Sequence, residues 1–461
     1  MKNDGMRAKM ARFNVDQTDA AGPDAPPSAW KPEAAVSTAP TEVTALQPDV
    51  IGRSGTKRGK TGVPAILVLE DGSVFMGTSC GATGEVAGEV CVNTVMIGYP
   101  EVISDPANAG QILAITYPQV GNYGIALADL ECERATLRAL VVRDVCDTPS
   151  NYRLDCSLPE FLVDQGIVGI TDVDTRALTQ LLRDNGPLRA IVSTNDLDPE
   201  SLLIKVRVTP TISEEDLVAE VSCEQPYLFT MNEEHIAWYP PLPDPRFKVI
   251  VIDLGVTRST LNNLTRLGCA VIVVPWDTPV AEILAYQPDG VVLSSGPGDP
   301  QALAPVIQTT AGLLGILPLL AIGLGHQVLA LAVGGEVQRL AFGHHGANYP
   351  VSDLAFDKVK ITAQSHAFSV LPDSLGALES RDLGMAIAMN ANCGRIRIAE
   401  ANLNDGTVEG LLYLDVPAVS VEYLPEFPAS NAIGSNAFNS FMGFMEENTT
   451  GLGMDSEDSN A

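Results

Sequence analysis

Short apolar runs bounded by turn residues fill the first half of the chain. Two such runs within residues 65–75 flank Asp71-Gly72, a pair typical of a tight β-hairpin turn. Glycines recur further along between more apolar runs, such as residues 111–117. A helix is predicted within residues 174–183, where three leucines lie on one helical face. The pattern therefore predicts a β-rich first domain.

Strand and helix patterns alternate in the second half of the chain. They follow a connector over residues 206–246 that ends in consecutive prolines, which neither a helix nor a sheet continues through. Apolar runs typical of buried strands cover residues 248–253, 270–274 and 290–293, and helical patterns cover residues 259–267 and 280–285. Such alternation predicts a doubly wound, mainly parallel α/β sheet, with a site at the carboxyl ends of its strands.

The two ends of the chain lack any sustained periodicity. The first 60 or so residues are rich in Ala, Pro, Thr and Asp, and their early aspartates exclude a transit peptide, which is poor in acid. The last residues are acidic and polar. We therefore expect a disordered extension over residues 1–62, a β-rich domain over 63–205, the connector over 206–246, an α/β domain over 247–448 and a disordered tail over 449–461.

Residues 319–330 predict a strand, a sharp turn and a helix. A short apolar run leads into Gly323, a second glycine follows at Gly325, and an apolar, alanine-rich segment continues as a helix. This arrangement lifts a nucleophile clear of a sheet and directs helix N–H groups at a developing oxyanion. The residue at the tip, Gly323, has no side-chain atom that could attack a substrate.

The charge of the chain limits its partners. Acidic residues outnumber basic residues by 57 to 28, which gives a formal net charge of −29. A surface this negative argues against nucleic acid or an anionic membrane as the main partner. No apolar run reaches the length that spans a bilayer. These features favour a cytoplasmic protein that binds neither nucleic acid nor membrane.

The spacing of cysteine and histidine gives no metal motif. The eight cysteines lack CxxC spacing, so reduced and mostly buried thiols are expected rather than disulfides or zinc ligands. His344 and His345 are adjacent, neighbouring side chains in a strand or turn point apart, and we expect no cysteine or carboxylate cluster beside the pair. We therefore expect packing roles for the pair, structural hydrogen bonds for His326 and no metal in this chain.

Four motifs of the second domain carry a resemblance to a known family. They are Gly-Pro-Gly-Asp-Pro at residues 296–300, Gly-His-Gln at 325–327, Phe-Gly-His-His-Gly at 342–346 and Ile-Thr-Ala-Gln-Ser-His at 361–366. They resemble the class I glutamine amidotransferase domain of the carbamoyl-phosphate synthetase small subunit. The motifs at residues 67–72, 98–101, 116–118 and 174–179 are similar to the N-terminal domain of that subunit. The resemblance covers about residues 64–448.

The resemblance implies an activity for the family. A cysteine at the strand–helix turn attacks the side-chain amide of glutamine, and a histidine–glutamate pair activates that cysteine. The released ammonia passes to a large, ATP-using subunit, which makes carbamoyl phosphate for pyrimidine and arginine biosynthesis. The resemblance therefore implies a heterodimer with the large subunit, ATP and magnesium on that partner, and no cofactor in this chain.

The catalytic positions of the family are altered in this chain. The resemblance places the family's cysteine at Gly323 and its histidine at Leu424, within Leu424-Pro425-Glu426 where the family has His-Pro-Glu. Glu426 therefore remains only as a vestigial catalytic residue. The chain has five histidines and none follows His366, so no neighbour in the last segment replaces the base.

The glutamine pocket of the family is only partly retained. Ala107, Ser365 and Ala367 stand where the family has serine, asparagine and glycine. The retained positions are Gly296, Gly298, Leu324, Gln327 and Phe368. Losing a nucleophile, its base and several binding groups together indicates a relaxed demand for glutamine, so glutamine binding by this chain is doubtful.

We therefore expect a small subunit of carbamoyl-phosphate synthetase that does not hydrolyse glutamine usefully and serves as partner of an ammonia-using large subunit. Two alternatives stay open. The chain is still an active glutaminase subunit, using an unrecognised group or one from the large subunit, or it is a pseudoenzyme with a regulatory binding role. Whether the chain is an enzyme by itself is left open by the sequence.

Overall fold

The computed structural model describes residues 62–231, 241–354, 358–378, 386–425 and 436–454. All of them belong to one compact unit, Gln47–Ala461. Apart from Gly62, the extension expected over residues 1–62 lies outside the described residues. None of the helices within the described residues has both the length and the apolar character needed to cross a bilayer.

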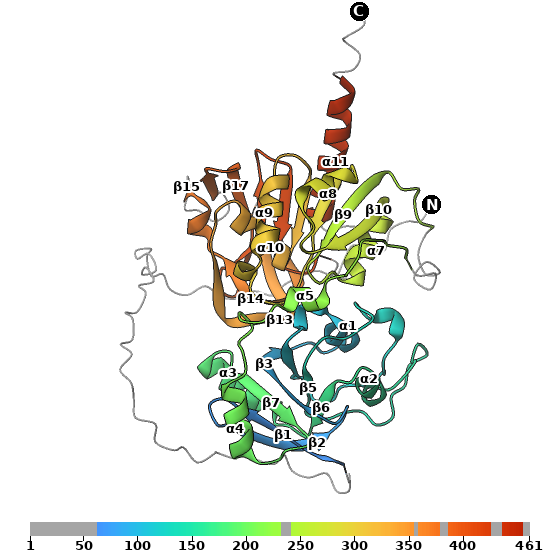
Figure 1. Ribbon diagram of the computed structural model, residues 1–461, viewed down its shortest axis with the longest axis vertical. Coiled ribbons are helices and arrows are strands. Elements are labelled where there is room, and N and C mark those ends of the chain that lie inside the picture. Colours follow the sequence, from blue (N-terminus) through green and yellow to red (C-terminus); the bar gives the residue numbers. More distant parts are fainter. Residues whose placement is uncertain (1–61, 232–240, 355–357, 379–385, 426–435, 455–461) are drawn as a thin grey trace, which may run out of the picture. The chain divides into compact units, whose positions relative to one another are not determined.

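The first domain is a closed β-barrel, which confirms the prediction of a β-rich domain (Figure 1). Its strand order is β1-β2-β6-β5-β4-β3-β7. The strands are β1 Pro64–Leu69, β2 Val74–Ser79, β3 Glu85–Asn93, β4 Gln111–Ile115, β5 Ala139–Val141, β6 Val168–Thr171 and β7 Arg189–Ser193. The helices are α1 Tyr99–Ser104, α2 Leu158–Asp164, α3 Thr175–Asn185 and α4 Pro199–Arg207, with 3-10 turns η1 Pro106–Asn108 and η2 Leu127–Asp129.

Strand β1 shows why its sequence is apolar at every position. Leu67 and Leu69 pack into the core inside the barrel, whereas Ile66 and Val68 pack against α4 on the outside. A strand buried on both faces reads as a continuous apolar run instead of an alternating one. The predicted Asp-Gly hairpin is confirmed, since β1 and β2 pair antiparallel and Gly72 has a φ of 96°.

The second domain is built on one mixed sheet, and its doubly wound, parallel centre is confirmed. The main path of the sheet runs β14-β13-β17-β18-β19-β12-β11-β9-β10-β8. Five strands form the parallel centre, in the order β10, β9, β11, β12, β19, and each of them runs parallel to the next. The strands of this central part are β9 Phe247–Asp253, β10 Cys269–Pro275, β11 Gly290–Leu293, β12 Leu319–Ile322 and β19 Ala418–Val421.

An antiparallel extension widens this sheet beyond β19, and the sequence patterns had not indicated it. Its strands are β13 Val337–Asp353, β14 Lys358–Val370, β15 Ala377–Leu378, β16 Ile387–Asn390, β17 Gly394–Asn402 and β18 Val408–Tyr413. A 3-10 turn, η4 Pro372–Leu375, follows β14. The outer strands β13 and β14 alternate irregularly between buried and exposed positions and contain register shifts, which hides their period of two.

Helices cover both faces of the parallel strands. They are α7 Arg258–Arg266, α8 Val280–Ala285, α9 Ala304–Leu313, α10 Leu324–Ala332 and α11 Asn436–Met454, with a 3-10 turn η3 Pro300–Ala302. Ile250 and Ile252 of β9 pack into the core that α9 and α10 share, and those helices lie side by side in Figure 1. Val249 and Val251 face the opposite core, formed with α7 and α11.

Two expected boundaries need correction. The connector expected over residues 206–246 contains α5 Leu217–Val221 and an edge strand, β8 Tyr227–Leu228, which pairs antiparallel with β10. Both elements are too short for a periodic signal.

The disordered tail expected from residue 449 onward is wrong for its first residues, because helix α11 continues to Met454. Its buried apolar side chains are anchored earlier in the helix, and a helix propagates easily once it is nucleated. Residues 455–461 lie outside the described residues.

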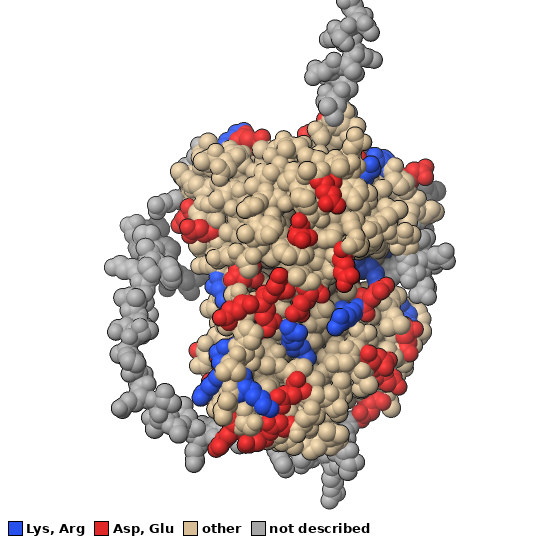
Figure 2. Space-filling view, in the orientation of Figure 1, with Lys and Arg blue, Asp and Glu red and all other residues tan. Residues whose placement is uncertain are grey.

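Hydrogen bonds join the two domains. Glu131 of the barrel domain accepts from the backbone N–H and the hydroxyl of Ser259, at 2.9 and 2.6 Å. Ser213, which precedes α5, donates to Asp299 Oδ2 at 2.7 Å. Figure 2 shows acidic side chains gathered on the face over which α5 lies. Glu214, Glu215 and Asp216 belong to that stretch.

Helix α11 is expected to stabilise the α/β domain through Phe441. A Cβ atom added to Gly290 of β11 would lie 2.7 Å from the Phe441 ring, so helix and strand are in direct contact. Phe441→Ala should lower the free energy of unfolding by about 3–5 kcal/mol, because it leaves a cavity at a fully buried site. Chemical denaturation measures this loss. The control Asn439→Ala, at an exposed position of the same helix, should change it by less than about 0.5 kcal/mol. Equal effects of the two substitutions would contradict the packing described.

Candidate functional site

The predicted strand–turn–helix is confirmed at Gly323. Strand β12 ends at Ile322, α10 begins at Leu324, and Gly323 between them has φ 54° and ψ −116°. Its N–H donates to the carbonyl of Val421 at 2.9 Å, and its carbonyl accepts from the N–H of Gln327 at 3.2 Å. Residues with a side chain are strained at such a positive φ. The backbone therefore has the strained conformation of a nucleophile elbow, but a glycine occupies it.

The space beside Gly323 would accept a small side chain. A Cβ atom at this position would lie 3.3 Å from Ser295 Cβ and 3.7 Å from the carbonyl oxygen of Glu422. The first contact is slightly tight and the second is ordinary. By contrast, a Cβ on Gly325 would lie 2.5 Å from the carbonyl oxygen of Leu293. Gly325 is therefore required by packing, whereas Gly323 is not.

A recess at the start of α10 brings together every residue that the resemblance assigns to glutamine contact. It holds about 300 Å³ of empty volume, part of it open to solvent. The retained and the replaced positions both line it: Ala107, Gly296, Gly298, Leu324, Gln327, Ser365, Ala367 and Phe368. Ala107 belongs to η1 of the barrel domain, so both domains contribute to the recess.

Two polar residues of this recess, Gln111 and His366, were missed by the sequence analysis. Gln111 comes from β4 and is almost fully buried, and its Oε1 has no hydrogen-bond partner among the described residues. His366 follows Ser365 in a motif that the sequence analysis did quote, and that proximity was the available signal.

Glu422 is a further residue that the sequence analysis missed. It follows β19, is almost fully buried, and accepts from Gln327 Nε2 at 2.7 Å. The same amide nitrogen donates to the carbonyl of Phe368 at 3.2 Å. Both amide hydrogens of Gln327 are therefore held within the protein. Burial raises the pKa of Glu422 well above its usual range.

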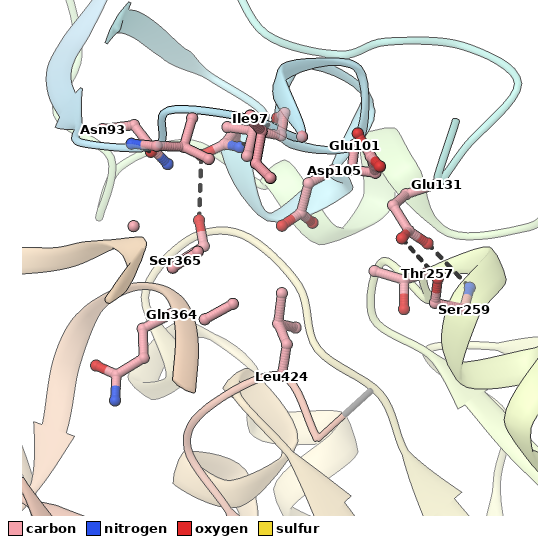
Figure 3. Close-up of a pocket in the computed structure, with 17 residues that line it drawn as sticks. Asn93, Ile97, Glu101, Asp105, Glu131, Thr257, Ser259, Gln364, Ser365 and Leu424 are labelled. Atoms are coloured by element: carbon pink, nitrogen blue, oxygen red, sulfur yellow. Dashed lines mark hydrogen bonds between the residues drawn. The ribbon is translucent and has the colours of Figure 1, made fainter. Parts of the chain in front are cut away.

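Leu424 lines a second cavity, which lies between the two domains and holds about 570 Å³ of empty volume (Figure 3). The N–H of Leu424 donates to the carbonyl of Ala363 at 2.9 Å, and its side chain points into the cavity. Ser365 reaches the same cavity and donates to Asn108 Oδ1 at 3.2 Å. Leucine offers this space only hydrocarbon. Glu426, the expected vestigial catalytic residue, lies outside the described residues.

Three carboxyl groups line the same cavity, and Figure 3 shows them on its upper side. Burial raises the pKa of Glu101 and that of Asp105 to about 7 each. Burial also raises the pKa of Glu131, although its hydrogen bonds with Ser259 work in the opposite direction. The residues that line this cavity include neither lysine nor arginine. Glu101 and Asp105 are therefore partly protonated near neutral pH.

The histidines of the second domain form a buried polar cluster near the recess. His326 Nδ1 lies 2.8 Å from Ser420 Oγ, which supports the structural role expected for this residue. The side chains of His344 and His345 have different surroundings: His344 Nε2 lies 2.8 Å from Asp405 Oδ2, whereas His345 Nδ1 is buried without a hydrogen-bond partner among the described residues. The expectation that no carboxylate cluster accompanies the pair is wrong, because residues distant in sequence lie beside it in the folded protein. The fold brings Asp405 and Glu409 to His344.

The cysteines form no disulfide among the described residues, but the expectation that most of them are buried is wrong, because five of the eight are only partly buried. All eight are free thiols, and Cys91, Cys269 and Cys393 are buried. Burial raises the pKa of Cys269 to about 12 and that of Cys393 to about 11. Neither thiol lies at the strand–helix turn, and neither is poised as a thiolate.

A glycine-tipped elbow at the carboxyl end of a parallel sheet, with a recess beside it, defines a class I glutamine amidotransferase domain. Residues 250–444 match the family described as "Glutamine amidotransferase class-I", and residues 67–192 match "Carbamoyl-phosphate synthase small chain, CPSase domain". The chain belongs to the carbamoyl phosphate synthase small chain family.

Curated relatives cover nearly the whole of both domains. The carbamoyl phosphate synthase small chain of Syntrophotalea carbinolica is 42% identical over 391 residues, which covers 84% of this chain and 100% of the relative. The small chain of a Synechococcus species is 42% identical, and the match covers 83% of this chain and 94% of the length of that relative. The pyrimidine-specific small chain of Halalkalibacterium halodurans is 39% identical and covers 83% of this chain and 97% of its own.

The carboxyl of Asp105 should make stability depend on pH. The folded state keeps its proton up to about pH 7, whereas the unfolded chain releases it near pH 4, so the folded state loses stability as the pH rises between these values. Asp105→Asn removes this effect while its amide oxygen still accepts from the N–H of Ala107. The urea concentration at the unfolding midpoint is measured for both proteins across this pH range. The midpoint of the variant minus that of the parent should increase as the pH is raised from about 4 to about 7, and should stay constant above that pH. A difference that does not change with pH would contradict this account.

Proposed function

We propose that this chain is a carbamoyl phosphate synthase small subunit that does not hydrolyse glutamine and serves as partner of an ammonia-using large subunit. The observation that carries the proposal is the glycine at the tip of an otherwise intact elbow. ATP and magnesium belong to the large subunit in this proposal, and this chain needs no cofactor. The product, carbamoyl phosphate, would serve pyrimidine and arginine biosynthesis.

Hydrolysis of a side-chain amide requires three things. A nucleophile must attack, a base must take and return its proton, and N–H donors must stabilise the oxyanion of the tetrahedral intermediate. The first turn of α10 still offers its backbone N–H groups. In this proposal Gly323 occupies the nucleophile position and Leu424 the base position, so the first two requirements are not met.

Ser295 is the nearest candidate for a substitute nucleophile. Its Cβ lies 3.3 Å from the position that a Cβ on Gly323 would take. Its hydroxyl is buried and has no hydrogen-bond partner in the part of the chain that the structure describes. A serine attacks only when a base accepts its proton. Without such a contact Ser295 stays a neutral alcohol, which disfavours the still-active glutaminase alternative.

The expected decrease in the rate of glutamine hydrolysis supports the proposal. Removing a nucleophile or its base costs on the order of 10⁶-fold in turnover, and the losses do not add because the two groups act as a unit. Oxyanion donors and binding alone leave roughly 10³-fold over water. That residual rate is too small to supply a biosynthetic enzyme with ammonia.

Contacts within the recess support weak glutamine binding as well. Both amide hydrogens of Gln327 are held by Glu422 and by the carbonyl of Phe368. A bound glutamine would have to break one of these contacts or use other groups. The exposed carboxylates near α5 and the net charge support the exclusion of nucleic acid as a partner.

The first test is a comparison of nitrogen sources. The chain is purified with the large subunit of the same organism, and carbamoyl phosphate formation is measured with glutamine and with ammonium. We expect formation with ammonium and no glutamate release above the rate of the large subunit alone. Ser295→Ala should leave both rates unchanged. Glutamine turnover equal to that with ammonium would contradict the proposal.

The second test restores the missing groups. The double substitution Gly323→Cys with Leu424→His should release glutamate at least about 100-fold faster than the matched control Gly323→Ala with Leu424→His. The two variants share the backbone strain at residue 323, at most about 2 kcal/mol, and differ only in the sulfur. Equal rates would show that the elbow no longer positions a nucleophile for glutamine.

A further inference from the structure

Three side chains with metal-binding atoms meet inside the sheet of the second domain. They are His344 of β13, His366 of β14 and Glu409 of β18, here called the His–Glu cluster. All three are buried, and one ligand atom from each lies within 4.8 Å of the others. The rings of His344 and His366 meet edge to face, with centroids 4.8 Å apart.

The hydrogen bonds of His344 leave one ring nitrogen without a partner. Its Nε2 lies 2.8 Å from the carboxylate of Asp405, which accepts, so a ring with a single proton carries it on Nε2. Its Nδ1 then carries a lone pair. This atom is buried and has no hydrogen-bond partner among the described residues, and Glu409 Oε1 lies 3.7 Å away.

His366 has the same arrangement on its other side. Its Nδ1 lies 2.8 Å from the carbonyl oxygen of Phe368, which only accepts, so Nδ1 carries the proton. Its Nε2 faces Gln364 Oε1 at 3.2 Å. The Gln364 nitrogen is turned toward Glu409 Oε2, to which it donates at 2.8 Å. Two acceptors therefore face each other, with no hydrogen between them.

Glu409 adds a carboxylate to these lone pairs. It is almost fully buried and accepts from Asn402 Nδ2 at 2.8 Å and from Gln364. No lysine or arginine is paired with it within the described residues. A buried carboxylate without a counter-charge is costly. Two imidazole rings and a carboxylate thus offer ligand atoms within 4.8 Å of one another, and the Gln364 amide oxygen lies 3.2 Å from His366 Nε2, so a cation between them would satisfy these groups.

We propose that His344, His366 and Glu409 bind a divalent transition metal of the zinc class. Two imidazole nitrogens and one carboxylate oxygen are a known zinc ligand set. Each histidine also has the outer partner that metal-bound histidines use, namely the carboxylate of Asp405 and the carbonyl of Phe368. Gln364 Oε1 or a water would supply the fourth ligand.

The geometry requires only small side-chain movements. Zinc–ligand distances of about 2.0–2.2 Å place tetrahedral ligand atoms roughly 3.4 Å apart. The atoms of the His–Glu cluster lie within 4.8 Å of one another, so rotations that move each by about 1 Å would close the site. Figure 3 shows the Gln364 amide directed away from the interdomain cavity, although Gln364 also lines that cavity.

The role of the metal follows from where its ligands come from. Strands β13, β14 and β18 belong to the antiparallel extension; β13 and β14 follow each other in the chain, whereas β18 comes from a later part of it. The site exists only after these strands have assembled, so metal binding would stabilise the folded extension. This role is independent of glutamine hydrolysis.

The competing arrangement places a proton where the metal would be. With Glu409 protonated and the Gln364 amide reversed, the amide nitrogen would donate to His366 Nε2 and Glu409 would donate to the amide oxygen. His344 Nδ1 would still lack a partner. The two arrangements differ in whether the chain binds metal, which can be measured directly.

The test uses the full chain, purified without chelators from zinc-supplemented cultures. We expect about one zinc per chain by elemental mass spectrometry. After the zinc is stripped with dipicolinate, added Co²⁺ should give the visible absorption bands of four-coordinate cobalt, and added zinc should raise the melting temperature. Absence of zinc, of cobalt bands and of the thermal shift in the parent chain would overturn the proposal in favour of the protonated cluster.

Substitutions locate the metal. Glu409→Gln keeps the shape of the side chain and removes its charge, and His344→Gln removes a ligand nitrogen. Each should weaken Co²⁺ affinity at least about 100-fold. The matched control His345→Gln, next in sequence and equally buried but outside the His–Glu cluster, should bind cobalt like the parent. Undiminished binding in Glu409→Gln would place the metal elsewhere and overturn the proposal.

Discussion

The turn at Gly323 is the constraint on which the site depends. Its φ of 54° and ψ of −116° turn the chain sharply from β12 into α10, and the hydrogen bonds of its N–H and its carbonyl fix both sides of the turn. An L-residue is strained here, and enzymes tolerate such strain where the side chain does the chemistry. Glycine adopts the same turn without strain. The turn therefore keeps its shape with a glycine, which has no side chain that could attack a substrate.

The other changes at the site are compatible with a loss of hydrolysis and not of folding. Leu424 lines the interdomain cavity, and the replaced residues Ala107, Ser365 and Ala367 line the recess. None of these residues belongs to the two cores that cover the sheet. The packing that stabilises the domain is therefore separate from the residues that line the recess and the interdomain cavity.

Local signals made much of the fold predictable. The β1–β2 hairpin, helix α3, the parallel strands β9 to β12 and the turn at Gly323 each follow from apolar periodicity or turn residues within a short window, whereas the parallel strand β19 was not predicted. The antiparallel extension was not predictable in this way, since β13 and β14 alternate irregularly. The resemblance predicted that the recess residues lie together. It did not predict that His344 lies beside Glu409, because these two residues belong to strands far apart in sequence. Glu422 did leave a signal, as one acid at the end of an apolar run that predicts a buried strand.

The most direct test of the central claim is a search for the covalent intermediate. The complex with the large subunit is mixed with glutamine, quenched in acid, and this chain is analysed by intact-mass and peptide mass spectrometry. The account predicts no glutamyl adduct at any residue, because no side chain at the elbow can form one. A glutamyl adduct on Ser295, on any cysteine or on another residue of this chain would contradict it.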